Sequence, residues 1–318
     1  MFMYNAVPHF SFIPPPDILA IRDTMRYRRK IVNAMTAEKN RLSNCLTVSG
    51  IKLDEVLSDL HGSKTGKALI AQVIEHGGGG FGPEPFIDRR VKATIGEFIE
   101  ALDGEVEPAT VDKMKLITGH LAYLEGMKTD IEQSIASLSS AYQDKIDLLS
   151  TIPGIDTISA TSIISEIGVD MSQFGSVGQF LSWVGVVPQN NESANKKKTT
   201  RIAKGNAWLK PVLVQCANAA IKDKNHPEMR DKHMAIRKRR GFKKAIVATA
   251  KRIATCAYFM LLRNEVYNPA LAYGKSAPKK GKIELDKLIR HYQDKGYTVA
   301  VEGEPLPELS SRAQGTTA

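Results

Sequence analysis

Two long stretches of the chain carry apolar residues at alternating spacings of three and four. In the first, which follows a run of three prolines, seven of nine such positions between Ile18 and Leu46 are apolar. In the second, eight of nine positions between Met114 and Tyr142 are apolar or aromatic. This spacing is typical of a coiled-coil seam. The pattern predicts two long helices, which form an antiparallel coiled-coil hairpin, a dimeric coiled coil or part of an ordinary helical bundle.

The ends of these helices and the segment between them have their own signals. Asp17 can cap the first helix, because a carboxylate can accept hydrogen bonds from the free N–H groups of a first turn. Gly50 lies near the expected end of that helix. Residues 51–104 contain three short stretches of helical spacing, separated by a glycine-rich break at 77–82. We therefore expect a small helical insertion, at about 47–107, at the tip of the long helices.

A tight turn, Pro153-Gly154-Ile155-Asp156, has helical apolar spacing on both sides. This pattern is typical of a helix-hairpin-helix, in which the glycine allows the turn and the hairpin amides face a DNA phosphate. Ile152 and Ile155 would anchor the turn in the core. The alternative is a plain turn between two helices with no ligand.

The rest of the chain reads as further helices. A helix is expected from about 207 to 222, and a basic one from about 228 to 264 whose second half has one apolar face. The tail at 273–318 suggests one helix, a short strand and a disordered end. The predicted fold is therefore mainly α: an unmatched N-terminus at 1–10, an arm with its insertion at 11–147, and a helical C-terminal domain at 148–272.

The positive charge of the chain is concentrated in one block. Residues 196–252 contain 18 Lys and Arg against 3 Asp and Glu, a formal charge of +15 within a chain total of +10, so the other 261 residues carry −5. This asymmetry favours a site for a polyanion, and nucleic acid is the leading candidate. A solvated basic surface without a partner is the alternative.

Composition narrows the class of protein. The chain has 318 residues, of which 42% are hydrophobic and 25% charged, as in ordinary globular proteins. We found no stretch of the roughly 20 apolar residues that a bilayer span needs, and the N-terminus does not read as a signal peptide. Three cysteines without metal-like spacing favour a reducing cytoplasm. We expect a cytoplasmic protein with no membrane partner.

The segment from Pro188 to Trp208 is the best candidate for chemistry. It reads as a polar loop between apolar elements, and it holds one serine, Ser193, among lysines and Arg201. A serine nucleophile that attacks a phosphodiester needs cations to hold the phosphate and a group to take its proton. By residue type alone, Ser193 is more often a loop hydrogen-bonder. The sequence shows no phosphate-binding loop and no histidine, cysteine or aspartate pattern of a metal site.

The run GVVPQNNESANKKKTTRIAKGNAWLK resembles the C-terminal domain of a large family of bacterial insertion-sequence transposases, which includes the bridge-RNA-guided recombinases. The family pattern combines a G-[LV]-x-P turn, a loop with a central serine, a K-G-[ND] turn and a following W-L. The turn at 153–156 and the phrase QFLSWVGVVP accompany it, and the resemblance covers residues 11 to about 301. The positions that match are Gly185, Pro188, Asn191, Ser193, Lys196, Lys204, Gly205, Asn206, Trp208 and Leu209.

The resemblance implies a mechanism and a set of DNA-binding residues. In the family, a serine attacks the phosphodiester and forms a phosphoserine link to DNA, while four acids of an N-terminal RuvC-like DEDD domain bind Mg²⁺. Ser193 holds the nucleophile position. Asn195 stands where the family usually has glycine. Charge, the hairpin pattern and the resemblance together predict DNA contacts at Gly154, Lys196, Lys197, Lys198, Arg201, Lys204, Arg237, Lys238, Arg239, Arg240, Lys243 and Lys244.

Only ten residues precede the matched region, so we expect a transposase without its nuclease domain. Such a chain would bind no metal itself, and Mg²⁺ would act only where the nuclease domain is supplied. The expected partners are DNA, a structured guide RNA, and a second copy or a full-length transposase. Two alternatives stay open. The chain could be a binding-only regulator that dimerises with a full-length transposase, or a decayed reading frame.

Overall fold

The structure is a computed structural model, and it describes residues 14–188, 191–193, 196–199 and 201–269. The chain divides into a compact unit at 1–267 and a second unit at 268–318. Within the described residues the fold is mainly helical, as predicted, with one pair of short strands. The expectations for the N-terminus at 1–10 and the tail at 273–318 lie outside the described residues.

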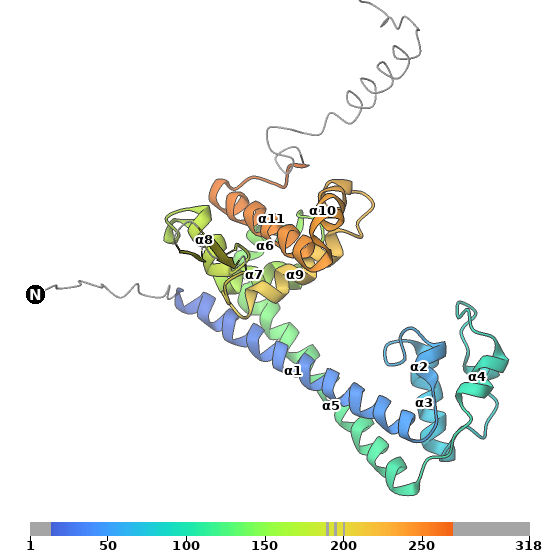
Figure 1. Cartoon of the computed structure of the whole chain (residues 1–318). Helices are drawn as coiled ribbons and strands as arrows, with labels where there is room; N and C mark the ends of the chain where they lie inside the picture. Colours follow the sequence, from blue (N-terminus) through green and yellow to red (C-terminus); the bar gives the residue numbers. More distant parts are fainter. Residues whose placement is uncertain (1–13, 189–190, 194–195, 200, 270–318) are drawn as a thin grey trace, which may run out of the picture. The chain divides into compact units, whose positions relative to one another are not determined.

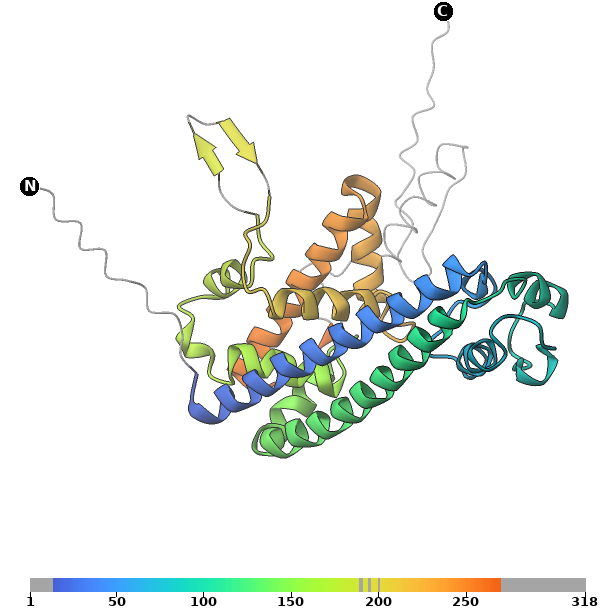
Figure 2. The ribbon, with the colours of Figure 1, turned by 90° about the horizontal axis from the view of Figure 1, so that it is seen from below.

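Helices α1 (Pro16–Val48) and α5 (Pro108–Ser139) form the arm and pack side by side (Figure 2). They run antiparallel, because Arg28 pairs with Glu132 and Glu38 pairs with His120. The second predicted helix is shorter than expected. It ends at Ser139 and is followed by a 3₁₀ turn, η2 (Ser140–Tyr142).

The predicted cap of α1 is wrong. The N-cap position is Pro15, and its side chain makes no capping hydrogen bond. Asp17 instead lies in the first turn and accepts a hydrogen bond from the Tyr142 hydroxyl. Prolines can begin a helix because the first backbone N–H groups need no intrahelical partner. The hydrogen bond between Tyr142 and Asp17 therefore joins the start of α1 to η2, just after the end of α5.

The buried positions of α1 shift by one residue in its middle. The predicted seam included Val32 and Lys39, whereas the buried side chains are Ile31 and Glu38. An α-helix has 3.6 residues per turn, so it drifts by about 20° per heptad from a strict 3.5-residue repeat. Glu38 is thus an acid of the N-terminal half that is buried, in contrast to the solvated helix charge expected for this class of residue.

The segment between the two arm helices forms the tip insertion. It consists of α2 (Leu53–Val56), α3 (Lys64–His76), a 3₁₀ turn η1 (Glu84–Phe86) and α4 (Ile95–Ala101). Sequence explains two of these beginnings. Ser63 caps α3, and Thr94 with Glu97 forms a capping box at α4.

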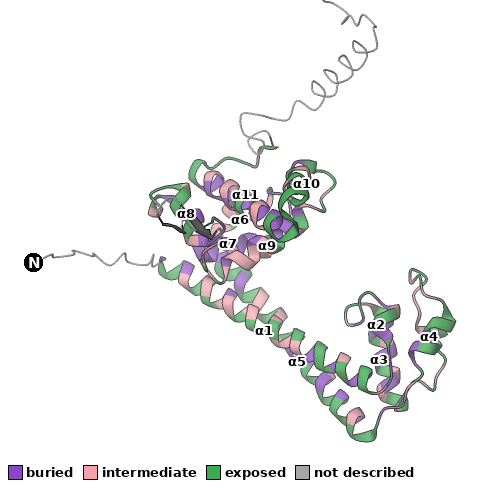
Figure 3. Ribbon diagram, viewed as in Figure 1, coloured by how far each residue is buried: buried purple, intermediate pink, exposed green. Residues whose placement is uncertain are grey.

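The C-terminal body is a set of helices that pack around α11 and α7 (Figure 1). Its elements are α6 (Gln143–Ser150), α7 (Thr157–Ile167), η3 (Met171–Gln173), α8 (Val177–Val184), α9 (Leu209–Ala220), α10 (Pro227–Arg240) and α11 (Phe242–Arg263). Figure 3 shows buried residues concentrated on the faces where these helices meet. Ile152 and Ile155 are both buried, as the turn pattern predicted.

The basic helix expected at about 228–264 is two helices. Gly241 has φ +80°, a conformation that residues with a Cβ rarely adopt, and it separates α10 from α11. The two helices then pack against each other. Helical spacing continues across this glycine in the sequence, so the break was not visible from the apolar pattern.

Helix α11 is long and apolar enough to cross a membrane, with a mean hydropathy of 1.4 over its best window. By length and composition alone, α11 is thus the one candidate span among the described residues. In the structure, however, α11 is a core helix. It is 56% buried over its most apolar stretch, and it packs on α6, α8, α9 and α10. A core helix of a globular domain passes the same test.

Most of the buried apolar residues fall into two groups. The body cluster joins the start of α1 and the end of α5 to helices α6–α11, and its members on the arm include Ile21 and Ile135. The tip cluster joins the end of α1 and the start of α5 to the insertion, and includes Leu46 and Met114. The arm therefore contributes to both clusters, one at each of its ends.

Candidate nucleic-acid interface and serine hairpin

Ser193 lies on a short β-hairpin rather than in an irregular loop. Strands β1 (Asn191–Ser193) and β2 (Lys196–Thr199) pair antiparallel, and the register places Ser193 opposite Lys196. Figure 2 shows the hairpin extending away from α8 and α9. The backbone thus brings the predicted nucleophile position next to the first residue of the lysine run.

The base of the hairpin is a close crossing of two backbone segments. Gly185 and Gly205 have φ of +81° and +58°, and a Cβ built on Gly185 would lie 2.7 Å from the Cα of Gly205. A Cβ on Gly205 would collide with the carbonyl oxygen of Val184. Only glycine satisfies both the positive φ and this approach. Beyond the crossing, a bridge between Pro188 and Ile202 continues the pairing. We call the crossing of Gly185 and Gly205 the neck.

The residue after the neck accepts hydrogen bonds from free N–H groups where the next helix begins. The side-chain oxygen of Asn206 accepts hydrogen bonds from the N–H groups of Trp208 and Leu209, both at 2.8 Å. The Asn206 N–H donates to the carbonyl of Trp183 at 3.1 Å, so it also ties the segment to α8. The ammonium group of Lys210 donates to the carbonyls of Ala203 and Lys204. These bonds hold residues 203–206 in place and orient the root of β2.

A buried carboxylate joins this segment to the arm. Glu166, at the end of α7, accepts two hydrogen bonds from the Arg26 guanidinium at 2.8 and 2.9 Å and one from the Asn206 amide at 3.1 Å. The guanidinium of Arg26 also lies 5.1 Å from the ring centroid of Trp208. Arg22 donates to the carbonyl oxygens of Ser165 and Glu166.

Sequence reasoning missed Glu166. The available signal was that Glu166 is the only charged residue in the otherwise uncharged helix α7. A carboxylate in such a position needs partners, because burying an unpaired charge is costly. Hydrogen bonding to Glu166 raises the pKa of Arg26, while burial lowers the pKa of Arg22.

The predicted helix-hairpin-helix turn faces the protein. Gly154 has φ +82°, as the turn requires, but a Cβ on it would lie 2.5 Å from the backbone nitrogen of Ala220 in α9. The carboxylate of Asp156 accepts a hydrogen bond from the Ser159 N–H and caps α7. The close approach of α9 is thus a structural reason for the glycine. A DNA contact at Gly154 stays a prediction.

The predicted basic residues near the α10–α11 junction are exposed and adjacent. Four of them end α10 and two begin α11, so they flank Gly241 on both sides. The guanidinium of Arg237 lies 5.6 Å from the ring centroid of Phe242. Arg201 and Lys204, near the neck, are also exposed. We call Arg237, Lys238, Arg239, Arg240, Lys243 and Lys244 the junction patch.

Within the described ranges, no group of three or more His, Cys, Asp or Glu side chains is arranged to hold a metal ion. The described residues therefore do not offer a Mg²⁺ site of this kind.

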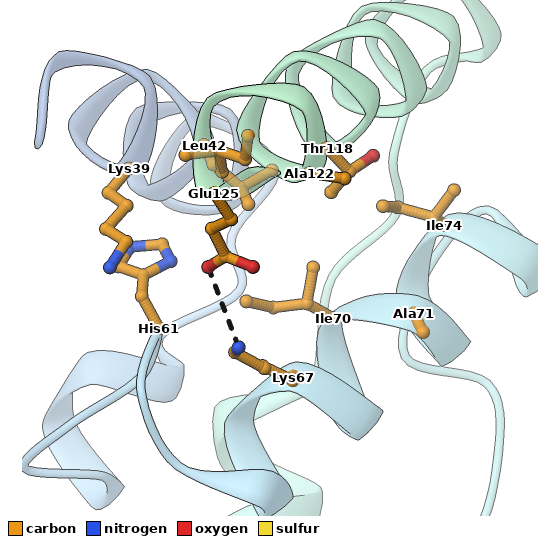
Figure 4. A pocket seen from close by; sticks show the side chains of 11 residues that line it. Lys39, Leu42, His61, Lys67, Ile70, Ala71, Ile74, Thr118, Ala122 and Glu125 are labelled. Atoms are coloured by element: carbon orange, nitrogen blue, oxygen red, sulfur yellow. Dashed lines mark ion pairs between the residues drawn. The ribbon is translucent and has the colours of Figure 1, made fainter. Parts of the chain in front are cut away.

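A separate cavity of about 380 Å³ lies where α3 meets the arm (Figure 4). Apolar side chains such as Ile70 and Leu121 form most of its lining, and Lys67 pairs with Glu125 across it at 3.8 Å. His61, another lining residue, shares a hydrogen bond of 2.8 Å with Ser43, and burial lowers its pKa. None of the predicted DNA-binding residues lines this cavity.

Comparison with known proteins locates the similarity. Residues 146–234 match the family model described as the transposase IS116/IS110/IS902 family. The chain is 30% identical over 141 residues to the transposase for insertion sequence element IS1111A of Coxiella burnetii, an alignment that covers 43% of this chain and 38% of the relative. It is 24% identical over 267 residues to a probable family 20 transposase of Pseudomonas aeruginosa, covering 82% of this chain and 70% of that protein.

The matched region begins in α6 and ends in α10, so it contains the hairpin, the neck and Glu166. The chain spans little more than a third of the length of the Coxiella relative. The resemblance drawn from the sequence motifs is thus confirmed at the level of a transposase domain. Residues 146–234 match the transposase domain of the IS116/IS110/IS902 family, and the chain is similar to proteins named as transposases.

Proposed function

We propose that the chain is a DNA transposase subunit of an insertion sequence, acting in the cytoplasm, and that Ser193 is its nucleophile. The observation that carries the proposal is the position of Ser193 on a hairpin rooted at the Gly185–Gly205 neck, inside the region that matches the transposase family. The lysines of β2 and Arg201 supply cations near the serine in the chain. Cations next to a reacting phosphate stabilise the charge that develops in the transition state.

The serine needs an activating group. A serine hydroxyl is a weak nucleophile near neutral pH and requires a base or a metal to take its proton. By resemblance, we propose that metal-binding acids of a full-length partner supply this activation in trans. A structured guide RNA is a further proposed partner of the assembled complex.

The test uses the intact chain mixed with a full-length relative and labelled DNA. We expect a covalent protein–DNA adduct in the mixture and none with the chain alone, with or without Mg²⁺. Ser193→Ala abolishes the adduct on this chain, whereas the matched variant Thr199→Ala on the opposite strand retains it. Resolving the two proteins by size shows which one carries the label.

The possible outcomes separate the alternatives. An adduct that survives Ser193→Ala removes the nucleophile assignment. An adduct formed by the isolated chain with Mg²⁺ removes the requirement for a partner. Stable DNA binding in the mixture without any adduct on this chain favours a binding-only regulator instead.

We further propose that the junction patch binds the DNA backbone. Lysines and arginines that contact phosphates release counterions, so the affinity falls steeply with salt and depends little on sequence. Replacing Arg237, Lys238, Arg239 and Arg240 with Ala is expected to weaken binding to all sequences about equally and to flatten the salt dependence.

A charge-matched control is available in the tip. Lys52, Lys64, Lys92 and Lys113 are exposed and lie in or next to the insertion. Replacing these four with Ala changes the net charge equally and is expected to leave most of the affinity. Equal losses in the two quadruple variants, measured by fluorescence anisotropy at several salt concentrations, would mean that net charge alone governs binding.

A further inference from the structure

We propose that Glu166 is a positioning residue for the Ser193 hairpin, and that it acts through Asn206. The inference rests on the proposed function, because it concerns the placement of the proposed nucleophile. Glu166 is buried at the end of α7, and its carboxylate contacts Arg26 of the arm and Asn206 of the segment that follows the neck. No hydrogen bond of the described residues joins Glu166 to the hairpin strands directly.

The chemistry of the carboxylate decides which way the Asn206 amide points. An ionised carboxylate is only an acceptor, so the Asn206 side chain must present its NH₂ group to Glu166. Its oxygen then faces the opposite way, toward the N–H groups of Trp208 and Leu209. Glu166 therefore selects the amide orientation in which Asn206 accepts from the N–H groups at the start of α9.

Asn206 fixes the base of the hairpin, residues 202–205, through the residues next to it. Gly205 of the neck immediately precedes Asn206, and the Asn206 N–H donates to Trp183 in α8. The bridge between Pro188 and Ile202 lies just beyond the neck. A rotation of the Asn206 backbone would therefore also move Gly205, and with it the neck at which both strands of the hairpin begin. The bond between Arg26 and Glu166 links this root to α1.

An exchange of donor and acceptor tests the contact itself. In Glu166→Gln, an NH₂ group replaces one carboxylate oxygen, so the side chain at 166 no longer requires the Asn206 amide to point its own NH₂ group toward it. In Asn206→Asp, two carboxylates face each other and repel. The double variant Glu166→Gln/Asn206→Asp restores one donor and one acceptor, and aspartate remains a good helix cap. The coupling in such a cycle isolates the pair.

The first readout is hydrogen–deuterium exchange of the amides at 201–209 and in the hairpin. Each single variant is expected to speed this exchange by roughly tenfold, which is the effect of losing one buried charge-assisted hydrogen bond. The double variant is expected to reverse most of the increase caused by Asn206→Asp, while the part caused by the weakened pair with Arg26 remains. Exchange in the tip insertion should not change in any of the three.

The second readout is the DNA adduct formed with a full-length relative. The single variants are expected to lower the rate at saturating DNA at least about tenfold while the Kd changes little, and the double variant restores most of the rate lost in Asn206→Asp. Such a split indicates a lost transition-state interaction rather than lost binding. A purely structural role would lower the rate and the binding together.

Glu132→Gln is the matched control. Glu132 accepts hydrogen bonds from Arg28, two residues along α1 from Arg26, but it lies on α5 within the arm. This variant also breaks an arginine–carboxylate pair and should leave the hairpin amides unchanged.

The proposal is overturned if the double variant shows the sum of the single effects, or if exchange rises equally in the tip and the hairpin. Failure of the proposed function is distinguishable. The hydrogen–deuterium exchange rates of the hairpin amides could change in the single variants and recover in the double variant while the parent forms no adduct on Ser193. In that case the chemistry assigned to Ser193 fails and the positioning by Glu166 stands.

Discussion

The tip cluster and the body cluster use the same two arm helices in different ways. In the tip, the ends of α1 and α5 share an apolar cluster with three short helices, whereas in the body their other ends share one with six helices, among them the core helix α11. Between the clusters the arm is more polar. Arg28 pairs with Glu132 at the edge of the body cluster, and Ile31 and Leu124, between the clusters, are buried without belonging to either.

This difference teaches that one heptad pattern can serve two cores. The spacing of three and four extends along both arm helices but includes the charged residues Arg28, Lys39 and Lys128, and an ion pair such as Arg28–Glu132 contributes less than apolar burial does. The arm is therefore a connection between two separately packed clusters. Changes at its middle and changes within one cluster should have different consequences.

The largest effect is expected from a charge at the middle of the arm. Leu124→Asp removes a buried side chain and buries a carboxylate without a partner, at a cost of about 5 kcal/mol in the free energy of unfolding. Circular dichroism should show lost helicity, and sedimentation should show a changed mass or shape. Tyr123→Asp, on an exposed neighbour, is the control. Ile131→Asp, at a half-buried position, should cost less, and unchanged helicity in Leu124→Asp would contradict the packing of the arm.

The next effect should be confined to one cluster. Phe98 in the tip and Phe180 in the body are both fully buried, so replacing either with Ala should cost about 3–5 kcal/mol. Hydrogen exchange is expected to rise in the insertion for Phe98→Ala and in α8 and α11 for Phe180→Ala. If both variants loosen both clusters equally, the clusters are a single cooperative core.

Smaller changes in the free energy of unfolding, of opposite sign, are expected when two glycines are replaced with alanine. Gly205→Ala forces a Cβ into a backbone with positive φ and into contact with Val184, so it should cost at least about 1–2 kcal/mol. Gly126→Ala, on the exposed face of α5 with open space around it, should stabilise the arm by about 0.5–1 kcal/mol. Chemical denaturation measures both. A stabilising Gly205→Ala would contradict the close crossing at the neck.

The smallest effect should depend on pH. The hydrogen bond from Tyr142 lowers the pKa of Asp17 below its usual 3.8, and it raises the pKa of Tyr142 from 10.0 to about 12. The stability from this bond is therefore present between these limits. It is lost as the pH falls through the lowered pKa of Asp17 and as the pH rises through the raised pKa of Tyr142.

Tyr142→Phe tests this dependence. The difference in stability between the parent and this variant should be flat around neutral pH and shrink at both extremes. Thermal unfolding across the pH range measures it, with Tyr27→Phe, at an exposed position, as the control. A difference that does not change with pH would show that the hydroxyl acts only by packing.

The site was predictable in part, and the residues show where the limit lies. The motif around Ser193 identified the segment, and the charge block identified the exposed residues of the junction patch, because residue type and local spacing suffice for both. The strand pairing of the hairpin was missed, since its lysine-rich strand has no apolar alternation. Glu166 was missed because its partners lie 140 residues away in Arg26 and 40 residues away in Asn206.

The sequence by itself determined the mainly helical class, the two arm helices, the short helices of the tip and the tight turn at Gly154. These follow from periodicity, caps and turn residues, which are local properties of the chain. Only the tertiary structure decided that Gly154 faces α9, that Gly185 meets Gly205, and that Glu166 joins the arm to the hairpin root. These contacts join residues far apart in the chain, and no local pattern specifies which distant backbone or charge a residue will meet.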